Sequence, residues 1–153
     1  MADSDYKFTY IHIGAYGKEC NLSVFQETSF FKLLIRNELH IPPSGPLFTY
    51  DTENFPVAFV GNEVFLLSEN LMRPYAGHNL SEKQRTFNYS LCMAQRYVEC
   101  AFGVLSIKWR ILHTALNVSK EFSKGIVKAC VLLHNVVQSK DGYRSEEIYM
   151  TQN

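Results

Sequence analysis

One acidic residue stands out as a candidate for chemistry because it lies beside a row of apolar residues. Glu99 sits between Val98 and Cys100 in a segment whose apolar residues recur with helical spacing. A carboxylate at the edge of a buried face needs a hydrogen-bonding partner, an ion pair or a metal ion. The same pattern is also typical of a solvated or salt-bridged glutamate, so the spacing alone leaves both interpretations open.

Two other kinds of site have little support in the sequence. The turn from Gly14 to Lys18 lacks the spacing of a phosphate-binding loop, and no Ser or Thr follows its lysine. The histidines show no His-x-x-x-His or His/Cys cluster of the kind that binds zinc, which favours core or surface positions for all of them: His12, His40, His78, His113 and His134.

Two helices are expected in the second half of the chain. Ser81 and Gln84 form a capping box at the start of a helix of about 26 residues that carries Glu99. Its apolar stripe comprises Phe87, Leu91, Ala94, Val98, Ala101 and Leu105. The next helix is predicted to begin after a Ser119 cap and to end before Asp141, with one inward face: Phe122, Ile126, Ala129, Leu133 and Val137.

The first half of the chain predicts shorter elements. A strand from Tyr6 to Ile13 follows a turn at Asp3 to Asp5, and a short helix from Thr28 to Glu38 is capped by Thr28 or Ser29. The apolar run from Val57 to Val60 is typical of a strand buried on both faces. This order of elements predicts an α/β layer fold.

The composition describes one ordinary domain. The chain has 153 residues, of which 46% are hydrophobic and 20% charged, and no apolar run approaches the roughly 20 residues that a bilayer requires. We expect a domain over residues 1–140 and a polar tail over residues 141–153. The first residues do not form a signal peptide and the four cysteines show no paired spacing, so we expect a protein of the nucleus or cytoplasm that is not secreted and has reduced thiols.

Charge is balanced overall but not along the chain. Residues 1–70 contain four basic and nine acidic side chains, whereas residues 71–140 contain ten basic and three acidic ones. Such an asymmetry favours a polyanion-facing surface in the second half, if the basic residues share one side. A solvated helical face is the alternative.

Eight short motifs, in order, resemble the DDE superfamily endonuclease domain of PIF/Harbinger transposases. No single motif is decisive, but together they extend over residues 1–140. They are the segments Asp3 to Phe8, Gly14 to Lys18, Val24 to Phe25, Phe59 to Glu63, Leu71 to Tyr75, Phe87 to Tyr89, Arg96 to Gly103 and Leu132 to Asn135.

The resemblance implies a ribonuclease-H-like fold whose acidic residues hold two divalent cations, Mg²⁺ or Mn²⁺, for DNA cleavage. In relatives the first Asp precedes the segment that resembles Asp3 to Phe8, so we expect an N-terminally incomplete domain. Relatives carry further acids at the positions of Asn21 and Asn62, and only the last acid, Glu99, is kept. The resemblance thus implies that Glu99 is catalytic and that a metal would be held by Glu99, Asn62 and Asn21.

An asparagine oxygen can bind Mg²⁺ but contributes no negative charge, so we expect the metal affinity to collapse. Glu63 is no substitute for Asn62, because neighbouring residues of an extended strand point to opposite faces. The helix before Glu99 has fewer arginines than its relatives have. Arg96 and Lys108 are the expected DNA contacts, and we expect DNA binding to be weak.

The resulting interpretation is a transposase-derived nuclease-like protein with a degenerate metal site that does not cleave DNA. An alternative is a domesticated, non-catalytic module that binds DNA or a Myb-like protein partner, with no membrane association and with a homodimer as one possible state. A decaying gene copy or a truncated gene model is the third interpretation. An Asp-bearing strand encoded upstream of Met1 would favour the catalytic interpretation.

Overall fold

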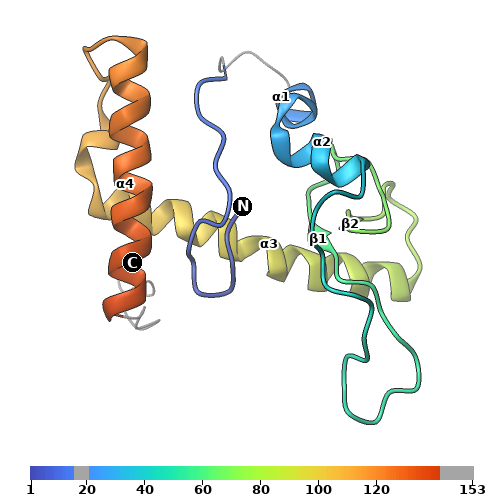
Figure 1. Ribbon diagram of the computed structural model, residues 1–153. Helices are drawn as coiled ribbons and strands as arrows, with labels where there is room; N and C mark the ends of the chain where they lie inside the picture. Colours follow the sequence, from blue (N-terminus) through green and yellow to red (C-terminus); the bar gives the residue numbers. More distant parts are fainter. Residues whose placement is uncertain (16–20, 142–153) are drawn as a thin grey trace. The chain divides into compact units, whose positions relative to one another are not determined.

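The computed structural model describes residues 1–15 and 21–141 (Figure 1). The predicted tail, residues 141–153, lies outside the described residues except for Asp141, as does most of the turn from Gly14 to Lys18. The chain divides into two compact units. We call Met1–Gly14 with Arg96–Asn153 the terminal unit and Ala15–Gln95 the middle unit, and each is described by itself.

The described elements are mostly helical, with one small sheet. The middle unit contains α1 (Asn21–Glu27), α2 (Ser29–Ile35), β1 (Phe59–Val60) and β2 (Leu71–Met72). The long helix α3 (Glu82–Lys108) begins in the middle unit and ends in the terminal unit, which also contains the 3-10 helix η1 (Arg110–His113) and α4 (Lys120–Asp141).

The start of α2 is the one that the sequence predicts. The Thr28 hydroxyl oxygen accepts a hydrogen bond from the Phe31 backbone N–H at 3.1 Å, which satisfies an N–H group that has no partner within the helix. The helix ends at Ile35 rather than Glu38. The chain turns away there because Asn37 adopts a positive φ of 53° and the Glu38 N–H bonds back to the Leu33 carbonyl at 2.9 Å. Helix α1 has no counterpart in the sequence prediction.

The predicted strand from Val57 to Val60 is shorter and more exposed than expected. Only Phe59–Val60 is a strand, and it pairs in parallel with Leu71–Met72. Val57 and Val60 are both exposed, so burial on both faces is wrong for this strand. A strand is buried on both faces only when further strands and two covering layers surround it. In the described residues the sheet has two strands.

Aromatic rings form much of the packing in the middle unit. The ring of Phe25 lies 4.6 Å from that of Phe65, and the ring of Phe30 lies 5.0 Å from that of Phe59, both edge to face. Gly61 allows the chain to pass close to this packing. A Cβ atom at Gly61 would lie 2.7 Å from the Phe65 ring, a distance at which the ring would have to move.

Helix α3 agrees closely with its prediction. It is 27 residues long, and the capping box is present: the Ser81 N–H donates to the Gln84 side-chain oxygen at 2.9 Å, and the Gln84 N–H donates to the Ser81 hydroxyl at 3.3 Å. In the predicted stripe Leu91, Ala101 and Leu105 are buried, whereas Ala94 is exposed.

The predicted strand from Tyr6 to Ile13 is not a regular strand. The described N-terminal segment makes one isolated antiparallel bridge, between Ala2 and Phe8, and the predicted turn is present, with the Asp3 carboxylate accepting from the N–H groups of Asp5 and Lys7. The backbone of Phe8 instead bonds to the side chain of Asn135, which takes the place of a neighbouring strand.

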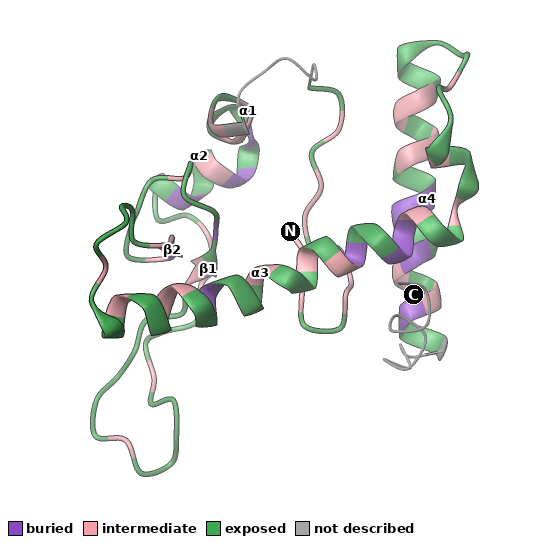
Figure 2. Ribbon diagram, turned by 180° about the vertical axis from the view of Figure 1, so that it is seen from behind, coloured by how far each residue is buried: buried purple, intermediate pink, exposed green. Residues whose placement is uncertain are grey.

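Helix α4 begins where predicted, ends one residue later than predicted, at Asp141, and has a different buried face. The Ser119 hydroxyl oxygen accepts from the Phe122 N–H at 3.3 Å, so the predicted cap is confirmed. Of the predicted inward residues, Phe122, Ala129 and Leu133 are exposed. The buried residues lie in the C-terminal half of the helix (Figure 2) and are Cys130, Val131, His134 and Gln138. The core of the terminal unit comprises Phe8, Ala101, Leu105, Cys130 and Val131.

None of the described helices is both long enough and apolar enough to cross a membrane.

Candidate functional site

Glu99 lies on the exposed side of α3. Its neighbours Val98 and Cys100 are half-buried and Ala101 is fully buried, so Glu99 flanks the core without entering it. Among the residues that the structure describes, Glu99 forms no ion pair. An exposed carboxylate of this kind is well solvated and needs no buried partner.

Asn62 occupies the turn that directly follows β1. Its side-chain oxygen accepts a hydrogen bond from the Val64 N–H at 3.2 Å, and its carbonyl oxygen accepts from the Phe65 N–H at 3.2 Å. This is the arrangement of an Asx turn, in which a short polar side chain stabilises the local backbone. The side-chain oxygen that would face a metal is therefore already bonded to the turn.

Arg73, just after β2, also stabilises this turn through hydrogen bonds. Its Nη1 atom donates to the carbonyl oxygens of Glu63 and Phe65, each at 3.2 Å. The side chain of Glu63 itself is exposed. The turn after β1 is thus fixed by both Asn62 and Arg73.

Asn21 is the first residue of α1, and its side chain lies outside what the structure describes. Both asparagines belong to the middle unit, whereas Glu99 belongs to the terminal unit. The structure therefore does not bring the three residues together within one unit. Over residues 1–15 and 21–141 it contains no group of three or more His, Cys, Asp or Glu side chains that could hold a metal ion.

His134 is a core histidine. Its side chain is 1% exposed, and its Nε2 atom lies 2.7 Å from the carbonyl oxygen of Tyr6. This agrees with the expectation that the histidines occupy core or surface positions.

The two predicted DNA contacts, Arg96 and Lys108, are both exposed on α3. Twelve residues of α-helix separate them by about 18 Å along the axis and by about 120° around it. Lys108 is also about 180° around the helix from Glu99, whereas Arg96 is about 60° from it. Of these two residues, Arg96 is therefore the one that lies on the side of Glu99.

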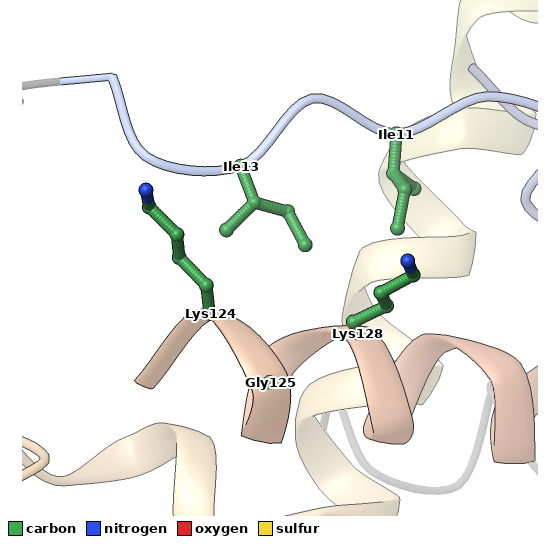
Figure 3. A pocket seen from close by; sticks show the side chains of 5 residues that line it. All are labelled: Ile11, Ile13, Lys124, Gly125 and Lys128. Atoms are coloured by element: carbon green, nitrogen blue, oxygen red, sulfur yellow. The ribbon is translucent and has the colours of Figure 1, made fainter. Parts of the chain in front are cut away.

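A hollow bordered by two lysines of α4 has no counterpart among the predicted sites. Lys124 and Lys128 border an open hollow of about 330 Å³, together with Ile11, Ile13 and Gly125 (Figure 3). The Lys124 ammonium group lies 2.9 Å from a Glu121 carboxylate oxygen and holds the pKa of that carboxyl below its ordinary value. Lysines four residues apart on a helix share one face, and this spacing was the available signal.

Comparison with known proteins gives one match. Residues 1–135 match the model of a family described as DDE superfamily endonuclease. The matched range includes the middle unit, most of the terminal unit and the positions of Asn21, Asn62 and Glu99. No curated protein matches the chain. No solved structure matches it either.

Proposed function

The chain belongs to the DDE superfamily endonuclease family, and we propose that it is a Harbinger-type, transposase-derived nuclease-like protein that does not cleave DNA. The observation that carries the proposal is the pair of amides at the two positions, Asn21 and Asn62, where the family resemblance implies carboxylates. Members of this family use divalent metal ions, and their substrate is DNA.

The donor groups do not fit two divalent cations. Mg²⁺ keeps a strong hydration shell, and carboxylate charge offsets the cost of removing part of it. Glu99 contributes one negative charge, and the two asparagines contribute none. In addition, the Asn62 side-chain oxygen is engaged with the Val64 N–H at 3.2 Å. We therefore infer no catalytic step through a metal ion in this chain.

The ribonuclease-H-like fold is part of the proposal. It is supported by the family and by the parallel pairing of β1 with β2, since parallel pairs are typical of sheets whose strands are connected through other elements. The turn after β1 that contains Asn62 is at the carboxyl end of a parallel strand. Ligands of open α/β sheets commonly bind at such ends.

A non-catalytic module that binds DNA or a Myb-like protein is the second candidate function. It is favoured by the ten basic and three acidic side chains of residues 71–140, which make this segment attractive to a polyanion without any metal site. A nuclear location and a homodimer are compatible with this second function.

A plasmid-nicking assay tests the main proposal. With Mg²⁺ or Mn²⁺, the purified chain is expected to nick supercoiled plasmid no more than a mock preparation does. The Glu99→Ala variant is the matched control, because it removes the one family carboxylate that remains. Metal-dependent nicking that disappears in Glu99→Ala would show that the proposal is wrong.

A further inference from the structure

The segment between α2 and β1 contains a closed loop, which Figure 1 shows as a long excursion without regular structure. Gly45 and Phe55 form an isolated antiparallel bridge at its base. The Gly45 N–H donates to the Phe55 carbonyl at 3.1 Å, and the Phe55 N–H donates to the Gly45 carbonyl at 2.8 Å. We call residues 45–55 the tip loop.

Hydrogen bonds inside the tip loop give it a defined shape. The Phe48 N–H donates to a carboxylate oxygen of Asp51 at 2.8 Å, and the Asp51 N–H donates to the Phe48 carbonyl at 3.0 Å. Four of the five prolines of the chain lie in or beside the loop and restrict its backbone: Pro42, Pro43, Pro46 and Pro56. A loop that is ordered before it binds loses less conformational entropy on binding.

The tip loop presents apolar side chains to solvent. Leu47 is 66% exposed, Phe48 is 58% exposed and Tyr50 is 78% exposed. The rings of Phe48 and Tyr50 are stacked, with centroids 5.4 Å apart and planes 4° from parallel. Single exposed apolar residues are common on protein surfaces, but a contiguous group of them indicates an interaction site. Aromatic side chains of this kind supply much of the binding energy at protein interfaces.

The charge around the tip loop selects the class of partner. Residues 45–55 contain two acidic side chains, Asp51 and Glu53, and no Lys or Arg. A nucleic-acid backbone would be repelled by this segment, whereas a basic surface would be attracted.

We propose that the tip loop is a docking surface for a basic protein partner with an apolar groove, into which Leu47, Phe48 and Tyr50 insert. The two acidic residues of the loop, Asp51 and Glu53, then face the basic rim of that groove. The surface is independent of the Glu99 position and of DNA cleavage, so the proposal goes beyond the proposed function. If the chain proved to be an active nuclease, the proposal for the tip loop would still stand.

Fluorescence anisotropy with the full chain tests the proposal. The probe is a labelled synthetic amphipathic helix composed of leucine and lysine, which combines a basic rim with an apolar face. We expect the chain to bind this helix and not to bind the same helix with glutamate in place of lysine. The double substitution Phe48→Ser with Tyr50→Ser should weaken binding by roughly tenfold or more, the size expected for hot-spot residues.

A second variant separates charge from folding. Glu53→Lys leaves the aromatic rings in place, and we expect it to weaken binding of the lysine helix in a salt-dependent manner. Tyr89→Ser on α3 is the matched control, because Tyr89 is an aromatic residue of the same unit with 68% exposure. The Tyr89→Ser variant should bind the lysine helix with the affinity of the unchanged chain. The circular dichroism spectra of all variants should be the same.

Several results would overturn the proposal. They are absence of binding, equal binding of the glutamate helix, or an equal loss in Tyr89→Ser. Self-association that depends on the tip loop, without binding of the lysine helix, would identify a second copy of the chain as the occupant and would also overturn it.

Discussion

The side chain of Asn135 pairs with both backbone polar groups of Phe8. The Phe8 N–H donates to the Asn135 Oδ1 atom at 2.8 Å, and the Asn135 Nδ2 atom donates to the Phe8 carbonyl oxygen at 2.8 Å. Phe8 is itself buried in the core of the terminal unit, and both bonds are partly buried. One amide side chain on α4 therefore fixes the position of the N-terminal segment.

Asn135→Ala should lower the stability of the chain measurably. The substitution leaves a partly buried N–H and a partly buried carbonyl without partners, and each unsatisfied group of this kind costs about 1–3 kcal/mol. Urea unfolding followed by circular dichroism measures the change. Ser139→Ala is the control on the same helix, because the Ser139 hydroxyl is exposed and bonds to the Asn135 carbonyl within α4. Equal midpoints for both variants would contradict the role of Asn135.

Gly61→Ala should destabilise the middle unit. The added Cβ would lie 2.7 Å from the Phe65 ring, which already packs against Phe25. Overpacking of this kind typically costs about 1–3 kcal/mol. Thermal unfolding should show the loss.

Gly103→Ala is the matched glycine control. It lies within α3, and among the described residues the added Cβ would meet nothing within 4 Å beyond its chain neighbours and the nearby helix backbone. Ala favours a helix over Gly by about 0.5–1 kcal/mol. We expect this variant to unfold at a higher temperature than the unchanged chain. A loss in Gly103→Ala as large as that in Gly61→Ala would argue against a local clash.

The pKa of the Glu121 carboxyl should depend on Lys124. The hydrogen bond from Lys124, followed by its charge, lowers the pKa of the Glu121 carboxyl. A lowered pKa in the folded state means that the contribution to stability is present above the unfolded pKa and is lost as the pH falls through the folded pKa. NMR titration of the Glu121 carboxyl should show a rise of its pKa in Lys124→Gln.

Added salt should produce part of the same rise in the unchanged chain, because both side chains reach solvent. Lys140→Gln, which changes a lysine in the last turn of α4, serves as the control and should leave the titration of Glu121 unchanged. A pKa of Glu121 that is the same in Lys124→Gln would refute the pairing.

Binding to duplex DNA should be weak and strongly dependent on salt. Non-specific complexes that neutralise several phosphates have Kd values of about 10⁻⁴ to 10⁻⁶ M at physiological salt, and a chain with net charge zero should fall at or beyond the weak end. Arg96→Gln should reduce the salt dependence, whereas Lys32→Gln in the acidic half should not. Tight or sequence-selective binding would favour the DNA-binding module over the degenerate nuclease.

Polar substitution on the exposed face of α4 should improve the solubility of the chain. Phe122, Leu132, Leu133 and Val136 are all exposed, and an apolar face of this size promotes association. Leu133→Gln should raise the soluble yield and shift the distribution in analytical ultracentrifugation toward the monomer. Val131→Gln, at a buried position of the same helix, should instead lower stability.

Local signals in the sequence predicted the helix starts well. The caps at Thr28, Ser81 and Ser119 are all confirmed, because a capping hydrogen bond joins residues only a few positions apart. The length of α3 also follows from its apolar spacing. Such interactions depend little on the rest of the fold.

Long-range packing explains the errors. The inward face of α4 was assigned by apolar content, which favoured Phe122 and Leu133. The observed buried face includes His134, because its side chain bonds to Tyr6 across the unit. The alternating residues of the N-terminal segment predict a strand for the same reason. They do not indicate that a side chain of a distant helix forms the hydrogen bonds of the Phe8 backbone. No local pattern reports a partner that is more than a hundred residues away.

Local signals in the sequence also do not predict whether Glu99, Asn62 and Asn21 lie close together. Asn21 and Asn62 follow from family motifs alone, whereas Glu99 also stands out by its place beside the apolar stripe. The family itself is confirmed over residues 1–135. Their roles as ligands remain predictions. The Asx turn at Asn62 was not anticipated, although Asn directly after a strand and a glycine is typical of such turns.

The bonds from Tyr6 and Phe8 to His134 and Asn135 also set an order of events during synthesis. They close loops of 128 and 127 residues, so the terminal unit cannot be completed until α4 has left the ribosome. At about 5–20 residues per second, the N-terminal segment waits roughly 6–25 s for its partners. The middle unit is contiguous in sequence and is free to fold within that interval. During the same interval the N-terminal segment, with the apolar ring of Phe8, is available to chaperones.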